Sequence, residues 1–262
     1  MKFAAYFLPL MAVLFLALNF INFNIVEDDS GPLKTDKFDS SLIKLNTLNK
    51  LESYIDSITT AKKIVPGSLD YVIEAKNVIS FRFYHKYATQ NLNENWIASV
   101  SQKITGLYLS SKITADDILT RPYGYCGQQS AVLMEFLEKK KFKCRAVYFP
   151  RHFALQVFVD EKWNYFDPNQ EPDIPKSKRA DISWLQNIDS LSVAYHKDTQ
   201  WVKKNLGYPI RFKLGKINEM QGPHAQLFQA TTKILSRIAF IFPLIGFVYL
   251  KKKAILANKD NK

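Results

Sequence analysis

Hydrophobic and polar positions follow a helical spacing in the first half of the chain. Between residues 45 and 58 apolar residues recur every three or four positions, and similar spacing covers about residues 69–87 and 93–109. This spacing places apolar side chains on one face of a helix. The pattern predicts three amphipathic helices that pack into a core, with Pro66-Gly67-Ser68 between the first two. The predicted core face of the third helix carries Trp96, Val100, Ile104 and Leu107.

The second half of the chain combines one more helix with short strands. A helix is expected to begin near residue 126 and to end at Lys139–Lys141, because basic side chains suit the negative end of a helix dipole. Runs rich in aromatic and β-branched residues predict strands over 144–149, 153–159 and 162–166. Weaker patterns indicate a short helix over 183–191 and an edge strand over 208–214. The fold class is therefore predicted as α+β, with helices packed on an antiparallel sheet.

Both ends of the chain are hydrophobic. Residues 3–23 carry no charge, and a helix of this length would span about 30 Å, so residues 3–25 are predicted to form a transmembrane signal anchor. A cleaved secretory signal is the alternative. Residues 234–250 predict a second transmembrane helix, unless this segment packs on the domain or lies in the membrane interface.

The distribution of charge suggests an orientation in the membrane. Residues 251–262 form a basic tail, which the positive-inside rule places in the cytoplasm. Residues 27–41 are predicted as a linker and residues 42–233 as one folded domain with its core at 69–170, facing outward. The net charge of the chain is +12, but residues 24–236 carry 29 basic and 23 acidic side chains, a net charge of only +6. We therefore expect the membrane as a partner and no nucleic acid.

Three residues in the predicted sheet and helix are candidates for nucleophilic chemistry. His152 precedes the second strand, and Asp167 follows the third. If Asp160 and Glu161 form a two-residue hairpin loop, paired residues sum to 321, and Asp167 lies diagonally across from His152 on the same face. A three-residue loop would put the two side chains on opposite faces. Cys126 opens the predicted helix, where a helix N-terminus favours the nucleophilic thiolate.

The stretch Gly124-Tyr125-Cys126, together with HFALQVFVDEKWNYFDP at 152–168, resembles the transglutaminase-like superfamily, whose members share a papain-like core. The resemblance covers about residues 121–170 and includes Trp163 and the Asp167-Pro168 pair. It implies that Cys126 is the nucleophile, His152 the general base and Asp167 the residue that orients the base. It also implies a protease, amidase, deamidase or cross-linking activity on a protein, peptide or envelope polymer. The sequence contains neither a Walker loop nor a GxGxxG motif, and we expect no cofactor and no metal.

Other interpretations remain open at this stage. One alternative is that Cys126 is only a small buried side chain, and another is that it forms a disulfide with Cys144. A transglutaminase-like domain can also serve as a binding or scaffold module for an envelope polymer or protein. His85, His196 and His224 are interpreted as structural or exposed, because their spacing indicates no metal site. The composition, rich in lysine and asparagine, is associated with bacterial inner-membrane proteins.

Overall fold

The chain divides into two compact units. The computed structural model describes residues 2–27, 31–33, 36–219 and 222–260, so that parts of the predicted linker (27–41) and basic tail (251–262) lie outside the described residues. One unit, here called the α+β unit, comprises residues 30–88 and 112–222. The other, here called the helical unit, comprises residues 1–29, 89–111 and 223–262. Each unit is described by itself.

The α+β unit contains a small antiparallel sheet of four strands in the order β3-β2-β1-β4. The strands are β1 (Lys143–Tyr148), β2 (Phe153–Val159), β3 (Lys162–Phe166) and β4 (Lys213–Leu214). This result confirms the α+β fold class and three predicted strands to within a residue. Of the predicted edge strand over 208–214, only the last two residues pair with β1.

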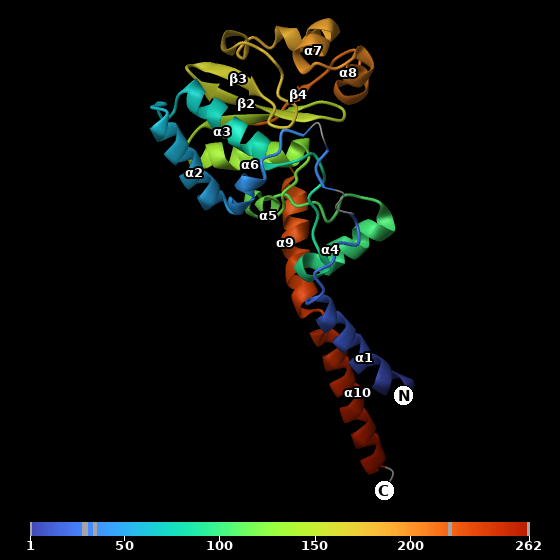
Figure 1. The fold of residues 1–262 in the computed structure, drawn as a ribbon. Coiled ribbons are helices and arrows are strands. Elements are labelled where there is room, and N and C mark those ends of the chain that lie inside the picture. The colour runs from blue at the N-terminus through green and yellow to red at the C-terminus, as the bar shows by residue number, and fades with distance from the viewer. Residues whose placement is uncertain (1, 28–30, 34–35, 220–221, 261–262) are drawn as a thin grey trace. The chain divides into compact units, whose positions relative to one another are not determined.

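Helices cover both faces of this sheet (Figure 1). On one face lie α2 (Leu48–Ala61), α3 (Leu69–Arg82) and α6 (Cys126–Lys139), with η1 (Ser40–Lys44) and α5 (Ala115–Leu119) beside them. On the other face lie η3 (Ser183–Gln186), α7 (Ile188–Tyr195) and α8 (Thr199–Leu206), and the short helix η2 (Lys176–Lys178) precedes them along the chain. Each face therefore has its own hydrophobic core.

Local sequence explains where several of these helices begin. Thr47 and Ser68 cap α2 and α3, each accepting a hydrogen bond from the backbone N–H three residues later. Helix α6 contributes fully buried side chains such as Leu133 and Phe136 to the larger core. Burial of a side chain of this size contributes about 1.5–3 kcal/mol. The predicted stripe of α2 also faces the core, where Leu51 and Ile55 are fully buried.

The hairpin between β2 and β3 has the predicted register. Val159 pairs with Lys162, and Leu155 pairs with Phe166, so that paired residues sum to 321. Asp160 and Glu161 both adopt positive φ angles, 51° and 60°. Two consecutive left-handed residues form the tight turn whose twist matches that of paired strands. The two-residue loop therefore places His152 and Asp167 on the same face.

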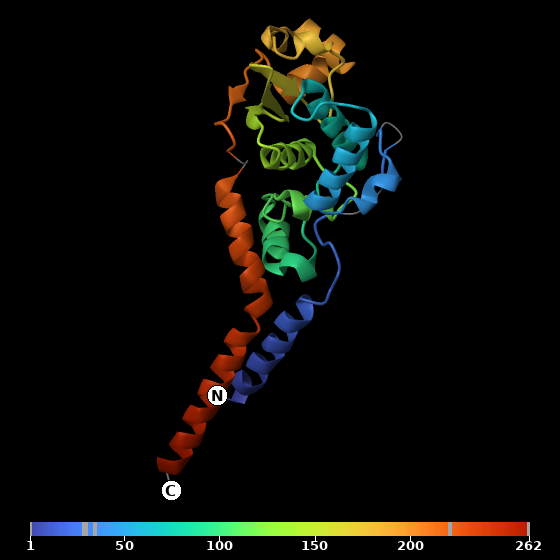
Figure 2. The same cartoon turned by 90° about the vertical axis from the view of Figure 1, so that its left-hand side faces the viewer.

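The described part of the helical unit contains four helices. They are α1 (Lys2–Leu18), α4 (Leu92–Thr105), α9 (Pro223–Ile238) and α10 (Ile241–Asp260). Helix α1 lies beside α10, as the two perpendicular views show (Figures 1 and 2). The two helices come close at Gly246, where an added Cβ would lie 3.4 Å from Leu8 Cδ1. Helix α4 packs against α9.

The face that α4 buries differs from the prediction. Ile104 and Leu107 are 78% and 60% exposed, so their assignment to a core face was wrong. The buried face carries Leu92 and otherwise small or polar residues, namely Asn95, Ala98, Ser99 and Gln102. Asn95 Nδ2 donates to Thr232 Oγ1 of α9 at 2.9 Å, and Ser236 Oγ donates to Asn95 Oδ1 at 3.1 Å. These bonds between side chains satisfy the polar face, and hydropathy spacing gives no sign of them.

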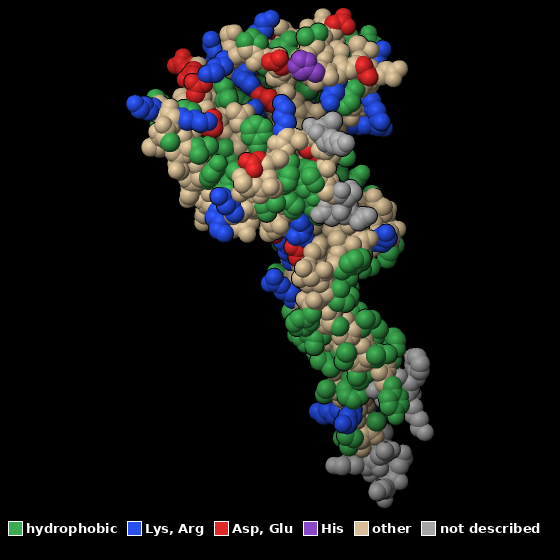
Figure 3. Space-filling model, viewed as in Figure 1, with side chains coloured by type: hydrophobic (Ala, Val, Ile, Leu, Met, Phe, Trp, Pro, Cys, Tyr) green, Lys and Arg blue, Asp and Glu red, His purple; other side chains and the backbone are tan. Residues whose placement is uncertain are grey.

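The hydrophobic helices near the two ends of the chain have other bounds than the predicted transmembrane helices. No single described helix is long and apolar enough to span a bilayer, but α9 and α10 meet this test together as a pair bent by 45°. The helix predicted over 234–250 is interrupted where α9 ends at Ile238 and α10 begins at Ile241. Hydrophobic side chains gather along α1 and α10 at the molecular surface (Figure 3).

Candidate active site

Cys126 is the first residue of α6. The preceding residue, Tyr125, is the N-cap and has an extended backbone with φ −78° and ψ 170°. A capping box joins Tyr125 to Gln128 in the first turn of the helix. In this box Gln128 Oε1 accepts from Tyr125 N at 3.1 Å. The same carboxamide accepts from Ala88 N at 2.8 Å and donates to Ala88 O at 2.7 Å. The sulfur is thereby held at a helix N-terminus, which favours an anionic group.

His152 and Asp167 form a buried pair at the ends of two neighbouring strands. His152 Nε2 hydrogen-bonds Asp167 Oδ2. The other carboxylate oxygen of Asp167 accepts from the backbone N–H groups of Asn169 and Gln170 at 3.2 and 3.0 Å. Asp167 is fully buried and His152 is 7% exposed. The loop after β3 thus fixes the carboxylate, and the carboxylate fixes the ring.

The electrostatics of this pair favour its charged form. Burial alone would lower the pKa of His152, but the charge and hydrogen bond of Asp167, and then those of Cys126, raise it. Burial would raise the pKa of Asp167, but the charge and hydrogen bond of His152 lower it. Cys126 therefore lies close enough to act on the imidazole. Because Nε2 already binds Asp167, Nδ1 is the nitrogen left to face the thiol.

Three residues predicted from the sequence are thus brought together from three elements. The structure also adds residues that the sequence analysis did not identify. Tyr195 Oη donates to Asp167 Oδ2 at 3.1 Å and lies 2.6 Å from Tyr165 Oη. Burial raises the pKa of both tyrosines well above the ordinary value, so their hydroxyl groups stay protonated.

Aromatic rings enclose the imidazole of His152. The rings of Phe149, Tyr195 and Trp201 have centroids 6.2, 6.4 and 6.4 Å from it. Tyr195 ends α7 and Trp201 lies in α8, two helices that the sequence indicated only weakly or not at all. A tyrosine in such a segment carries no local signal that it will reach a carboxylate in another loop. These contacts hold the ring in an apolar surrounding where charge interactions are strong.

The second thiol has no part in this arrangement. Cys144 and Cys126 are both free, so the optional disulfide is not formed. Burial raises the pKa of Cys144 to about 12, which leaves it protonated near neutral pH. Among the other histidines, His196 lies at the exposed end of α7, whereas His85 packs on Tyr125 beside the thiol.

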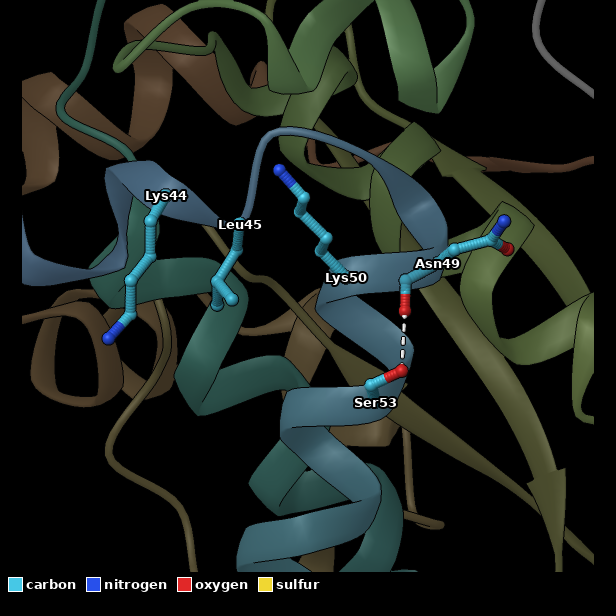
Figure 4. Close-up of a pocket in the computed structure, with 5 residues that line it drawn as sticks. All are labelled: Lys44, Leu45, Asn49, Lys50 and Ser53. Atoms are coloured by element: carbon cyan, nitrogen blue, oxygen red, sulfur yellow. Dashed lines mark hydrogen bonds between the residues drawn. The ribbon is translucent and has the colours of Figure 1, made fainter.

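The site is closed in this structure. Cys126 is only 4% exposed and packs against Ala146 and Phe153. A surface pocket elsewhere on the α+β unit is lined by Lys44, Leu45, Asn49, Lys50 and Ser53 (Figure 4). It contains none of the three candidate residues. Within the described residues, no group of three or more His, Cys, Asp and Glu side chains could hold a metal ion.

Comparisons with protein-family models, with curated proteins and with solved structures found no match to this chain. The resemblance to the transglutaminase-like superfamily therefore stays a prediction from the sequence. The function is therefore inferred from the geometry of the site and from its chemistry.

Proposed function

We propose that the chain is a membrane-anchored cysteine enzyme of transglutaminase-like type that attacks an amide or a related acyl group. The proposal is carried by one observation: His152 binds the buried Asp167 through one ring nitrogen and interacts with Cys126 at the start of α6. A thiol at a helix N-terminus, a histidine and a residue that orients the histidine make up the arrangement that cysteine nucleophiles need.

The proposed reaction assigns one role to each residue. His152 takes the proton of Cys126, and Asp167 keeps the ring oriented and stabilises its positive charge. The thiolate attacks the acyl carbon, so that a bond between sulfur and carbon forms and the carbonyl electron pair moves to oxygen. When this intermediate collapses, His152 returns the proton to the leaving group. The acyl-enzyme then transfers its acyl group to water or to an amine.

The proposed chemistry indicates a class of substrate. We expect a protein, a peptide or a cell-envelope polymer, and protease, amidase, deamidase and cross-linking activities are all compatible with an acyl-enzyme. The order of the elements supports the papain-like part of the proposal, because a helix that begins with the cysteine packs on an antiparallel sheet that carries the histidine and the aspartate.

A reaction with p-nitrophenyl acetate tests the proposal. Acylation of Cys126 releases p-nitrophenolate, and mass spectrometry of the intact protein shows the added acetyl group. We expect acetylation of the wild type and of the matched control Cys144→Ala, and at least a hundredfold loss in Cys126→Ala. Equal acetylation of the two alanine variants would contradict the assignment.

The closed site favours a second candidate function. Since the Cys126 side chain is almost fully buried, the domain can also act as a binding or scaffold module for an envelope polymer or protein. Alkylation of the folded protein by iodoacetamide separates the two functions. An enzyme is expected to react at Cys126 faster than a free thiol peptide at pH 6, whereas a scaffold module would react more slowly.

The helical unit supports the membrane part of the proposal because it buries polar side chains between its helices and exposes apolar ones. Its α4 and α9 bury polar side chains against each other, including Asn95, Gln229, Thr232 and Ser236. Its outer surface exposes large apolar side chains of α1 and α10, such as Leu10, Phe242 and Val248. Helices in lipid associate through small and polar residues, since apolar packing gives them no hydrophobic driving force.

We propose that α1 and the bent pair of α9 and α10 anchor the chain in a bacterial inner membrane, with the α+β unit on the outer side. Lys251, Lys252 and Lys253 support this orientation, because basic residues remain on the cytoplasmic side. Flotation with vesicles of phosphatidylcholine and phosphatidylglycerol tests the anchor. We expect the protein to stay with the vesicles in alkaline carbonate, and its release into the soluble fraction would contradict a spanning anchor.

A further inference from the structure

A short segment of the α+β unit runs alongside the loop that leads to Cys126. Tyr84 N donates to Pro122 O at 3.2 Å, and Gly124 N donates to Tyr84 O at 3.1 Å. At the far end of the segment, Ala88 exchanges hydrogen bonds with the side chain of Gln128. Residues 84–88 are therefore fixed at both ends against residues 122–128, and the side chains between them lie next to the thiol loop.

The ring of His85 is packed in place by this segment. Tyr125, which immediately precedes Cys126, packs against both His85 and Tyr87. Both ring pairs have centroids 4.5 Å apart; the His85 ring is tilted by 46° to Tyr125, and the Tyr87 ring is stacked on it at 13°. The backbone bonds of Tyr84 and Ala88 and the packing on Tyr125 thus position His85, as a residue that contacts a substrate needs to be.

Two buried polar atoms near this ring, His85 Nδ1 and Asn169 Oδ1, form no hydrogen bond of good geometry among the residues that the structure describes. The side chain of Asn169 nevertheless lies close enough to His85 to act on its pKa as a weak hydrogen-bond partner. Asn169 follows Asp167 by two residues, and its backbone N–H binds that carboxylate. Folded proteins leave few buried polar atoms unpaired, and such atoms are found at sites where a ligand or a reacting group completes the bonds.

The charge state of His85 suits a neutral donor. Burial lowers the pKa of His85, and the hydrogen bond of the Asn169 side chain and the charges of Asp36 and Asp167 offset this effect only in part. The charge of His152 adds to the lowering. A neutral imidazole carries one N–H group and can donate it to an oxygen that becomes negative during a reaction.

We infer that His85 is a further catalytic residue, which donates a hydrogen bond from Nδ1 to the acyl oxygen of the substrate while Cys126 Sγ attacks the acyl carbon. This inference rests on the proposed function. As the bond between sulfur and carbon forms, the carbonyl electron pair moves to the acyl oxygen, where the backbone N–H of Cys126 is a second donor. No proton leaves His85, and the electron pair returns when the leaving group departs.

Two substitutions distinguish the packing of the His85 ring from the hydrogen bond that its nitrogen donates. His85→Phe keeps a ring that can stack on Tyr125 and removes the donor. His85→Asn removes the ring and keeps a polar nitrogen near the position of Nδ1. Each variant is treated with p-nitrophenyl acetate, which has an acyl oxygen that becomes negative, and with iodoacetamide, which reports the reactivity of the thiolate without such an oxygen. Thermal unfolding shows whether each variant is folded.

We expect His85→Phe to slow acetylation of Cys126 by about a hundredfold, the typical effect of removing one oxyanion donor. Alkylation by iodoacetamide should change by less than about threefold, and His85→Asn should regain at least a tenth of the wild-type acetylation rate. Acetylation of His85→Phe at the wild-type rate would overturn the inference, as would equal losses of acetylation and alkylation. If the wild type itself is not acetylated at Cys126, the proposed function fails, and this inference fails with it.

Discussion

The pair of His152 and Asp167 makes a quantitative prediction for the substitution Asp167→Asn. Asparagine keeps the shape and one oxygen acceptor, but removes the negative charge that raises the pKa of His152. A hydrogen bond to a charged group contributes about 1.5–3 kcal/mol. A loss of about 2 kcal/mol changes an equilibrium by about thirtyfold. We therefore expect the population of imidazolium with thiolate, and with it the rate of alkylation of Cys126 near pH 7, to fall by about thirtyfold.

The pH dependence gives the prediction a second observable. In the wild type, the raised pKa of His152 keeps its ring charged through neutral pH, so the alkylation rate should depend little on pH there. In Asp167→Asn, burial lowers the pKa of the ring and only the charge and hydrogen bond of Cys126 offset it, so the rate should rise steadily with pH as a free thiol ionises. Stopped-flow alkylation with iodoacetamide between pH 5 and 9 measures both quantities.

A matched control is available within the same unit. Asp181 is exposed and its side chain accepts from Ser183 N at 3.0 Å, so Asp181→Asn makes the same chemical change away from the site. We expect this control to keep the wild-type rate and pH profile. If Asp167→Asn, folded by thermal unfolding, were alkylated as fast as the wild type with an unchanged pH profile, the assigned role of Asp167 would be refuted.

Two further predictions concern stability. Tyr195→Phe removes the hydroxyl that binds Asp167 and leaves Tyr165 Oη unpaired. This substitution should lower the free energy of unfolding by about 2 kcal/mol and slow the alkylation of Cys126 several-fold. An unchanged denaturant midpoint and an unchanged alkylation rate would contradict this prediction. Burial raises the pKa of Glu135 from its ordinary 4.5 to about 7, so the folded state binds its proton more tightly than the unfolded state. The free energy of unfolding should then decline as pH rises from about 4.5 to about 7. Glu135→Gln should remove about 1–2 kcal/mol of this decline, a moderate value because the side chain is partly solvated. Parallel curves of unfolding free energy against pH for the wild type and Glu135→Gln would refute this prediction.

The sequence predicted the strands and the pairing of His152 with Asp167 well because both depend on local rules. Strand alternation and a two-residue loop are enough to place His152 and Asp167 on one face, and the hairpin has that register. The N-terminal position of Cys126 likewise follows from the pattern of one helix. These features need only the order of residues and the geometry of neighbouring elements.

Features that depend on distant segments could not be predicted in the same way. Tyr195 and His85 reach the site from segments 28 residues after Asp167 and 41 residues before Cys126, and neither segment carries a signal of this contact. The error at Ile104 and Leu107 has a related cause. Hydropathy spacing assumes that apolar residues are buried, whereas α4 buries Asn95 against polar residues of α9.

The turn at Asp160 and Glu161 makes the site sensitive to loop length at a distance from its chemistry. One residue added between β2 and β3 would keep the strands compatible with pairing but reverse the parity of β3, so that Asp167 would point away from His152. Two added residues would restore the parity. Changes in this surface loop would therefore form or break the pair of His152 and Asp167 in single-residue steps. If the proposed function holds, evolution or a designer has here a way to inactivate the site and leave all three proposed catalytic residues in the sequence.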